Sequence, residues 1–480
     1  MEKIDQWIAG IPQASSDAAV LSVFDPVSGQ AYAECPRGSA ADISAAVNAA
    51  RSAFPAWSAL KASDRAFWLN RLADAIEIRS EAFCLCESRD TGKPLALVRE
   101  IEIPRAIANF RFFAAAATQS LDRAYHQEAG LNYTLHQPLG VVGVISPWNL
   151  PLYLLSWKLA PALAAGNCVI AKPSEITPMS ADLLARTAQE IGFPAGVLNI
   201  VQGAGDTVGA ALVAHPEVKA ISFTGSTAVG HRIAAVCADQ FKKVTLEMGG
   251  KNPALVFPDA PAHAAKSLVR AAFQNSGQIC LCGSRILVHR DVYAAFKQSF
   301  VAESAALKLG APADSTTQLG PVMSEAHFNK VLAYIAKAKG DGGTVLCGGG
   351  AVKPEGCDGW FIAPTVIEGL PMDSDFCQDE IFGPVVSLHA FDDDDHALAL
   401  ANASRYGLAA TVWTGDLVRA HRMARELECG IVWINTWMQR DLRTPFGGMK
   451  QSGLGREGGL EAMTFFTEPK TVCIGNLPNG

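Results

Sequence analysis

Residues 140–171 read GVVGVISPWNLPLYLLSWKLAPALAAGNCVIA, and this stretch decides the fold class. The apolar run at 140–145 predicts a buried strand, and the run at 168–171 predicts a second one. The intervening segment 153–165 has the length and composition of a helix. Two continuous apolar strands joined by a helix are typical of a parallel sheet that is covered on both faces.

The same alternation continues along the chain and predicts two successive α/β units. The first adds strands and helices at 180–191 (helix), 196–201 (strand), 207–213 (helix), 220–223 (strand), 228–238 (helix) and 243–246 (strand). The second has a strand at 254–257, a helix at 264–273, and strands at 286–288, 385–388, 410–413 and 431–434. The acidic run 392–395 is interpreted as the start of a helix. Residues 1 to about 115 are predicted to be mostly helical, with Ser63-Asp64 as a helix N-cap.

The composition favours a soluble globular protein of more than one domain over a nucleic-acid-binding or membrane protein. The chain has 480 residues, 49% of them hydrophobic and 18% charged, and a formal net charge of −7, which gives no basic surface for nucleic acid. No apolar stretch approaches the ~20 residues that span a bilayer, and the N-terminus has no secretory signal. The twelve cysteines lack framework spacing, which predicts reduced thiols and a cytoplasmic location.

Three residues supply the groups that carbonyl chemistry on a thiol requires. Cys280 follows Gly277-Gln278 in a glycine-flanked segment, Glu247 ends a predicted strand, and Asn149 follows Pro147-Trp148. A thiolate can attack a carbonyl carbon, an amide can donate to the resulting oxyanion, and a carboxylate can activate water. Taken singly, each residue also fits an inert role, as a packed cysteine, a turn asparagine or a salt-bridged glutamate.

Two other motifs are rejected as binding sites. Gly453-Leu454-Gly455-Arg456-Glu457-Gly458 matches G-x-G-x-x-G, but only 22 residues follow it, fewer than the roughly 30-residue βαβ unit that a dinucleotide fingerprint needs. We expect it to form a tight turn near the mouth of the active site. The pairs Cys84-x-Cys86 and Cys280-x-Cys282 are too closely spaced for zinc, so no metal site is predicted.

The chain resembles the NAD(P)-dependent aldehyde dehydrogenase superfamily over nearly its full length. The resemblance rests on a set of motifs that is far more specific than any one of them. They are Pro147-Trp148-Asn149, Lys172-Pro173-Ser174-Glu175, Phe223-Thr224-Gly225-Ser226-Thr227, Leu246-Glu247-x-Gly249-Gly250-Lys251, Gly277-Gln278-x-Cys280, Glu380-Ile381-Phe382-Gly383-Pro384 and Pro445-Phe446-Gly447-Gly448-x-Lys450.

The resemblance implies that Cys280 is the nucleophile, Glu247 the base for thioester hydrolysis, and Asn149 with the Cys280 N–H the oxyanion site. It implies NAD as cofactor, with Lys172 and Glu175 on the adenosine ribose, where Glu175 would repel a 2′-phosphate. Gly225 and Ser226 are expected at the pyrophosphate, on a helix N-terminus. The other residues expected to bind the cofactor are Trp148, Ser174, Gly205, Phe223, Glu380 and Phe382.

The family's architecture implies three parts. They are a Rossmann-type cofactor domain over 1–118 and 138–246, an α/β catalytic domain over 247–456, and a small β-arm over 119–137 and 457–480. In the family the arm joins subunits, so a homodimer or homotetramer is expected.

A finer resemblance concerns the substrate. Cys280-Leu281-Cys282, Ile103-Pro104-Arg105 and the segment 440–446 are similar to the branch that oxidises 2-aminomuconic and 2-hydroxymuconic semialdehydes. Those substrates carry a carboxylate opposite the aldehyde, and the arginine fork suits a carboxylate. By similarity to that branch, Arg105 and Arg443 are expected to bind it, with Trp157 and Phe446 walling the pocket. Either arginine could instead form a structural ion pair, and either aromatic residue could belong to the core.

Three alternatives stay open on the sequence. The substrate could be an uncharged aromatic or aliphatic aldehyde, the chain could be a cofactor-free thiol hydrolase, or it could be a binding protein that kept the fold. A CoA-acylating enzyme is disfavoured, because that branch generally lacks the glutamate found here as Glu247.

Overall fold

The run at 140–145 forms strand β8 (Val141–Ile145), whose five residues are all buried. The structure is a computed structural model that describes residues 1–119 and 122–476. β8 lies inside an eight-stranded sheet with the order β22-β12-β11-β8-β9-β10-β2-β3. Its parallel partners are β9 (Cys168–Lys172) and β11 (Val218–Thr224). The parallel sheet continues to β10 (Leu198–Ile200) beside β9 and to β12 (Lys243–Glu247) beside β11. The predicted parallel sheet is therefore confirmed.

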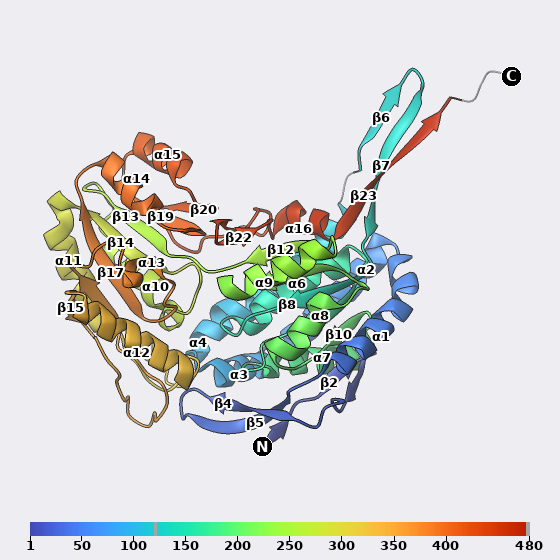
Figure 1. The fold of residues 1–480 in the computed structure, drawn as a ribbon, viewed down its shortest axis with the longest axis horizontal. Coiled ribbons are helices and arrows are strands. Elements are labelled where there is room, and N and C mark those ends of the chain that lie inside the picture. The colour runs from blue at the N-terminus through green and yellow to red at the C-terminus, as the bar shows by residue number, and fades with distance from the viewer. Residues whose placement is uncertain (120–121, 477–480) are drawn as a thin grey trace.

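Helices join these strands as the alternating pattern predicts (Figure 1). They are α6 (Pro151–Ala164), α7 (Met179–Glu190), α8 (Ala210–Ala214) and α9 (Thr227–Asp239). Every residue of α6 is buried, because α6 packs between β8, β9 and a further helix, α5 (Ile103–Thr118). The antiparallel edge strands are β2 (Gln6–Ile8), β3 (Ile11–Gln13) and β22 (Gly453–Leu454).

The second series forms a seven-stranded sheet with the order β15-β16-β17-β14-β13-β19-β20. All its pairs are parallel except the edge pair β15–β16. The strands are β13 (Asn252–Val256), β14 (Gly283–His289), β15 (Thr344–Cys347), β16 (Thr365–Glu368), β17 (Val385–Phe391), β19 (Ala409–Trp413) and β20 (Ile431–Ile434). The helices include α10 (Ala264–Phe273), α11 (Arg290–Ala305), α12 (Glu325–Gly340), α13 (Asp375–Gln378), α14 (Asp394–Asn402) and α15 (Leu417–Glu426).

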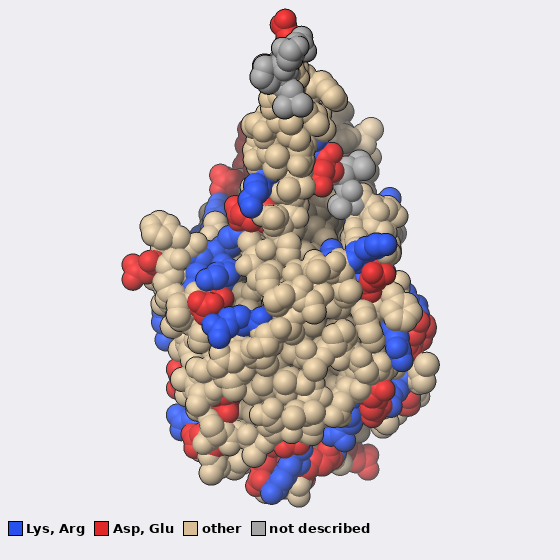
Figure 2. Space-filling model, turned by 90° about the vertical axis from the view of Figure 1, so that its right-hand side faces the viewer, with Lys and Arg blue, Asp and Glu red and all other residues tan. Residues whose placement is uncertain are grey.

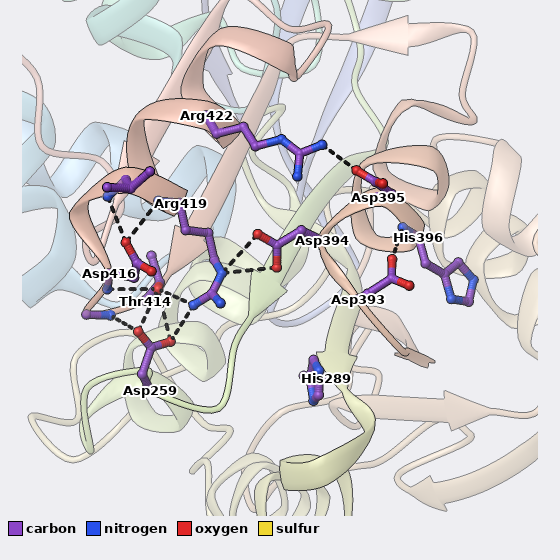
Figure 3. A network of polar contacts seen from close by, with 12 residues as sticks. Asp259, His289, Asp393, Asp394, Asp395, His396, Thr414, Asp416, Arg419 and Arg422 are labelled. Atoms are coloured by element: carbon purple, nitrogen blue, oxygen red, sulfur yellow. Dashed lines mark hydrogen bonds and ion pairs between the residues drawn. The ribbon is translucent and has the colours of Figure 1, made fainter.

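The acidic run at 392–395 starts α14, as predicted. Asp393 is the N-cap, and its side chain accepts a hydrogen bond from the His396 N–H at 2.8 Å. Arg419 of α15 then bonds both Asp394 and Asp259 (Figure 3). The network ties α14 and α15 to the loop after β13, so its role here is structural.

A three-stranded antiparallel arm projects from the first sheet (Figure 1). It consists of β6 (Ala124–Gln127), β7 (Gly130–Pro138) and β23 (Thr467–Gly475), in the order β23-β7-β6. Between α15 and the arm, α16 (Gly459–Phe465) packs on α6. Residues 120–121 and 477–480 of the predicted arm lie outside the described residues. Among the residues that are described, no helix is long and apolar enough to cross a bilayer.

The N-terminal prediction is wrong in part. Residues 2–36 form strands rather than helices, including β4 (Val20–Asp25) and β5 (Gln30–Pro36), which pair in a small separate sheet. These strands alternate only weakly between exposed and buried positions, so the two-residue period that identifies a strand is hard to detect in the sequence. The helix α2 (Ala62–Ile78) begins before the expected N-cap pair, with Lys61 at the cap position. The remaining helices are as expected, namely α1 (Ala40–Ser58) and α3 (Ser80–Thr91).

A buried ion pair lies between the end of α3 and the start of α5, in the unit that contains the first sheet. Lys93, just past α3, donates to both oxygens of Glu102 at 2.8 and 2.7 Å, and both side chains are almost fully buried. Replacing Glu102 by Gln leaves the ammonium uncompensated, so we expect the free energy of unfolding to fall by about 3–5 kcal/mol. The exposed pair Arg99–Glu81 is the matched control, and Glu81→Gln is expected to cost less than about 1 kcal/mol. Urea titration of both variants measures the difference, and equal losses would contradict this account.

Candidate active site

The loop that carries Cys280 is held in an unusual backbone conformation. Asn275, Ser276 and Gly277 follow α10 with φ values of 54°, 52° and 72°. A Cβ on Gly277 would lie 2.0 Å from the carbonyl oxygen of Gly383, so only glycine fits there. Left-handed backbone at two non-glycine residues is strained and persists only where surrounding contacts enforce it.

Gln278 supplies those contacts. Its side-chain oxygen accepts from the Met323 N–H at 2.9 Å, and its amide donates to the Asn275 carbonyl at 3.0 Å. Ser276 Oγ adds a bond to the Gly320 carbonyl at 2.7 Å. Asn252 then fixes the far side of the loop by donating to the Cys280 carbonyl at 2.6 Å. The sulfur of Cys280 is thus presented by an anchored turn.

Asn149 reaches this loop from the first sheet. It lies between β8 and α6, and its Nδ2 donates to the Gln278 carbonyl at 2.9 Å. Its own carbonyl accepts from Asn275 at 3.3 Å. One hydrogen of Nδ2 stays available for an oxyanion, and the Cys280 N–H makes no hydrogen bond to any described residue. The two predicted oxyanion donors are therefore both free to act.

Glu247 ends β12 as a buried carboxylate, and neither of its oxygens has a hydrogen-bond partner among the described residues. Burial raises the pKa of Glu247 well above its usual range, and the nearby Glu457 raises it further. Lys158 counters this effect and bonds Glu457 directly. A carboxyl group with a raised pKa and free lone pairs is suited to act as a general base.

The rejected glycine motif lies beside this carboxylate. β22 pairs with β12 so that Gly453 faces Glu247, although the sequence prediction assigned this segment to the catalytic domain. Gly455 and Gly458 have φ values of 81° and 78°, so the chain turns sharply between β22 and the short helix α16, whose N-cap is Gly458. The turn carries Glu457, whose carboxylate also accepts from Ser222 at 3.0 Å.

One cavity of about 250 Å³ brings Cys280 and Asn149 together with part of the predicted cofactor site, whereas Glu247 is not among its lining residues. It is lined by residues from both sheets, including Trp148, Asn149, Leu154, Gly225, Ser226, Met248, Gly249, Cys280, His327, Lys330, Glu380 and Phe382. Cys280 is only partly exposed. Desolvation raises the pKa of its thiol, and the carboxylates of Glu380 and Glu247 raise it further, against a smaller opposite effect of Arg440.

Glu380 is held by the glycine pair after Glu247. Its Oε1 accepts from the Gly250 N–H at 3.1 Å, and a Cβ on Gly249 would lie 1.9 Å from its Oε2. The Gly249-Gly250 sequence is thus required by the close approach of this carboxylate. Burial raises the pKa of Glu380 to about 7.

His327 and Lys330 line the same cavity and were not predicted. His327 Nε2 donates to the carbonyl of Phe382 at 2.6 Å, and Phe382 has a φ of 66°. Burial lowers the pKa of His327 to about 4, so the ring is neutral and has one N–H to donate. The ring also packs edge-on with Trp148 and Phe382. Both residues lie in the first turns of α12, some fifty residues from the nearest motif, so no local signal identifies them.

The remaining predicted cofactor residues lie along the carboxyl edge of the first sheet. Lys172 ends β9 and bonds Glu175 at 2.6 Å, next to the buried Ser174. Ser226 caps α9, and a Cβ on Gly225 would meet the ring of Phe223 at 2.4 Å. Gly205 begins a short helical turn at Gly205–Gly209 after β10. This crevice is where open α/β sheets bind nucleotides, and Ser226 at the N-terminus of α9 is suited to bind a pyrophosphate.

The structure separates the two predicted substrate arginines. The Arg105 guanidinium lies 5.1 Å from the Trp157 ring and 5.3 Å from the Tyr153 ring, and its buried Nη2 has no partner among the described residues. Arg443 instead has an 80% exposed side chain and bonds Asp441 at 2.6 Å. The expectation for Arg443 is therefore not supported, because its own neighbour already satisfies its guanidinium at the surface.

Arg440, three residues earlier, takes the place expected for Arg443. Its guanidinium lies 4.1 Å from the Phe446 ring and 5.4 Å from the Trp157 ring. Its Nη1 donates to the Tyr153 hydroxyl at 3.2 Å. The predicted aromatic walls Trp157 and Phe446 are thus buried between two cations. Among the described residues, no group of three His, Cys, Asp or Glu side chains could hold a metal ion.

The raised pKa of Cys280 gives a direct test of this environment. A thiolate is the reactive species, and its fraction increases as the pH approaches the pKa. We expect alkylation of Cys280 by iodoacetamide to accelerate continuously beyond about pH 8.5, the usual thiol range. Peptide mass spectrometry measures the rate, and the exposed Cys473 serves as the internal control. An alkylation rate at Cys280 that levels off near neutral pH would contradict a raised pKa of the Cys280 thiol.

Comparison with known proteins agrees with this geometry. The model of the "Aldehyde dehydrogenase family" matches residues 13–472. The chain is 48% identical to the 2-aminomuconic semialdehyde dehydrogenase of Danio rerio, with 95% of each chain covered. It is 43% identical to the 2-hydroxymuconic semialdehyde dehydrogenase of Pseudomonas sp. (strain CF600), covering 99% of this chain and 100% of the relative.

Solved structures agree over the same length. PnpE from Pseudomonas sp. WBC-3 superimposes with a TM-score of 0.96 at 41% identity, covering 100% of this chain and 99% of that one. The NAD⁺ complex of an aldehyde dehydrogenase from Bacillus cereus has a TM-score of 0.96 at 38% identity, with 99% and 97% covered. The protein is therefore a member of the aldehyde dehydrogenase family.

Proposed function

We propose that this protein oxidises a semialdehyde that bears a distal carboxylate to the corresponding diacid, with NAD as the hydride acceptor. The observation that carries the proposal is the pair of cations, Arg105 and Arg440, on the aromatic walls formed by Tyr153 and Trp157. The buried, unpartnered Nη2 of Arg105 is a donor that needs an acceptor, and a carboxylate supplies one. The names of the two relatives point to substrates of this kind.

The first chemical step is addition of Cys280 sulfur to the aldehyde carbon. Because burial disfavours the thiolate, the thiol proton must go to a base, and Glu247 has a raised pKa and free oxygens to receive it. The carbonyl oxygen becomes an oxyanion, which the Asn149 amide and the Cys280 N–H stabilise by donating hydrogen bonds.

The second half-reaction releases the acid. When bound, the nicotinamide ring of NAD supplies the hydride acceptor for oxidation of the Cys280 adduct. Glu247 releases the thiol proton to solvent and is again a carboxylate. The thioester is then attacked by water, whose proton Glu247 removes. The C–S bond breaks, the acid leaves, and the Cys280 thiol is restored.

NAD fits the crevice better than NADP. The carboxylate of Glu175, bonded to Lys172, would accept a bond from a ribose hydroxyl and repel a 2′-phosphate. Glu380 would hold the nicotinamide ribose, with Phe382 and Trp148 packed beside it. Ser226, at the start of α9, would bind the pyrophosphate.

The surface of the arm favours a homo-oligomer. Its outer strands β6 and β23 leave edges unpaired, and it exposes the apolar side chains of Tyr125, Leu135 and Ile474. The face of the molecule below the arm also carries a broad uncharged area (Figure 2). A second copy of this chain would cover such surfaces.

The cysteines favour a reducing compartment. All twelve are free, which fits a cytoplasmic location.

The carboxylate clamp makes a testable prediction. Replacing Arg105 or Arg440 by Gln removes a charged hydrogen-bond donor worth about 1.5–3 kcal/mol, so kcat/KM for a muconic semialdehyde should fall about 10- to 150-fold. Arg443→Gln is the matched control and should stay within about twofold. With an uncharged aromatic aldehyde, all three variants should resemble the wild type. A larger loss in Arg443→Gln would assign the carboxylate to Arg443, whereas equal losses with the uncharged aldehyde would favour the alternative substrate class.

The role of Glu247 predicts a different kinetic change. Glu247→Gln keeps the shape of the side chain but cannot accept a proton, so kcat should fall by about 10²- to 10⁴-fold. The Kd for NAD, measured by quenching of tryptophan fluorescence, should not change. Glu461→Gln, at an exposed position on α16, is the control. Retained turnover in Glu247→Gln would assign the base to another group.

A further inference from the structure

A second, smaller cavity adjoins the cofactor crevice behind Cys280. It measures about 20 Å³ and is lined by Lys251, Cys280, Cys282, Ser284, Glu380 and Phe382, with surrounding backbone and apolar residues. Cys280, Glu380 and Phe382 line both cavities. A volume above about 10–15 Å³ with polar walls accommodates one water molecule.

Lys251 is a buried cation without a counter-ion. Its residue is only 2% exposed, and among the described residues its ammonium makes no hydrogen bond and no ion pair. Its ammonium lies 5.4 Å from the ring of Phe376. The neighbouring cation Arg285 is satisfied differently, by three carbonyl oxygens at 2.8 to 3.0 Å. A buried charge of this kind normally requires a polar partner, and none of the described protein atoms provides one.

The groups around Lys251 point to that partner. Burial lowers its pKa to about 7, and the nearby Arg285 lowers it further, while Cys377, Glu380 and Asp379 raise it. Of these, Glu380 shares the small cavity with Lys251. His389, the other titratable group nearby, is held neutral, because burial lowers its pKa to about 4.

Two further polar groups at the cavity lack partners. Ser284 Oγ is buried and makes no hydrogen bond to any described residue. Glu380 uses Oε1 for the Gly250 N–H, which leaves Oε2 as an acceptor. An ammonium donor, a hydroxyl and a carboxylate acceptor around one water-sized volume are the three partners that a buried water typically has.

We propose that Lys251 is a positioning residue for Glu380 and acts across this cavity through one bound water, which also bonds Ser284. The inference rests on the proposed function, in which Glu380 holds the nicotinamide ribose. Lys251 would keep Glu380 ionised and pressed against the Gly250 N–H. The ionised carboxylate is the better acceptor for a ribose hydroxyl, so Lys251 would influence NAD binding without touching the dinucleotide.

The sign of the pH effect follows from Glu380. Its pKa is raised to about 7 by burial, opposed in order by the Gly250 N–H, Lys330 and Lys251. NAD should bind more tightly as the pH rises through about 7, where Glu380 ionises. Lys251 has a pKa of about 7 itself, so it carries its charge on the acidic side of this midpoint and loses it on the alkaline side. Removing that charge takes away an influence that favours the ionised form of Glu380 where it begins to appear, and should move the midpoint upward.

The experiment measures the Kd for NAD by tryptophan fluorescence between about pH 6 and pH 9. We expect Lys251→Met to raise the midpoint by about one pH unit and to weaken binding several-fold near neutral pH. Lys251→Arg, which keeps the charge, should retain the wild-type midpoint. Lys297→Met, which removes a lysine paired with Glu368 on the far side of β16, is the control and should match the wild type.

Glu380→Gln separates the two possible failures. Suppose that Glu380→Gln loses the pH dependence of NAD binding while Lys251→Met keeps the wild-type dependence of the Kd on pH. In that case the inference about Lys251 is wrong and the proposed function stands. If Glu380→Gln binds NAD as the wild type does, the ribose assignment itself fails. Should Lys251→Met not fold, a high-resolution crystal structure of the wild type decides. Water density bonded to Lys251, Ser284 and Glu380 supports the proposal, and a dry cavity overturns it.

Discussion

The hydrogen bond from Asn149 to the Gln278 carbonyl, 2.9 Å long, is the contact on which the active site depends. Asn149 lies at the carboxyl edge of the first sheet, whereas Gln278 belongs to the loop that enters the second. The bond therefore fixes the distance between the two α/β units at the point where a carbonyl substrate must lie. The reciprocal bond from Asn275 to the Asn149 carbonyl makes the junction two-sided. Optimal placement of an oxyanion donor relative to a nucleophile requires this kind of rigid support.

Buried charge is the second common feature of the site. Glu247 and Glu380 both have raised pKa values because burial removes their solvent. Each is balanced by cations that lie nearby rather than in direct contact, such as Lys158 beside Glu247. This arrangement leaves carboxylate oxygens free for water or ribose. A direct salt bridge would have stabilised the ionised form but occupied the same lone pairs.

The sequence predicted those parts of the site that depend on strand ends. Glu247 ends β12 and Asn149 follows β8, and parallel strands bring their carboxyl ends to one edge. Cys280 lies instead in the loop that leads into β14, where the glycine-flanked segment gave the signal. The structure places Arg440 rather than Arg443 beside the aromatic residues. The two arginines lie in an irregular loop, where no period fixes which side chain points inward. His327 acts through the backbone of Phe382, fifty-five residues away, and no sequence pattern encodes such a contact. The N-terminal strands were missed because each buries few residues.

The crystal structure of Glu247→Gln, treated with NAD and a muconic semialdehyde, tests the central claim most directly. In crystals kept at alkaline pH, part of the Cys280 thiol ionises without Glu247, so addition proceeds while hydrolysis stays blocked. The account then predicts electron density for an acyl group bonded to the Cys280 sulfur. Its carbonyl oxygen should lie within hydrogen-bond distance of Asn149 Nδ2, and its distal carboxylate between Arg105 and Arg440. An unmodified Cys280, or an acyl chain whose carboxylate points to solvent or to Arg443, would contradict it.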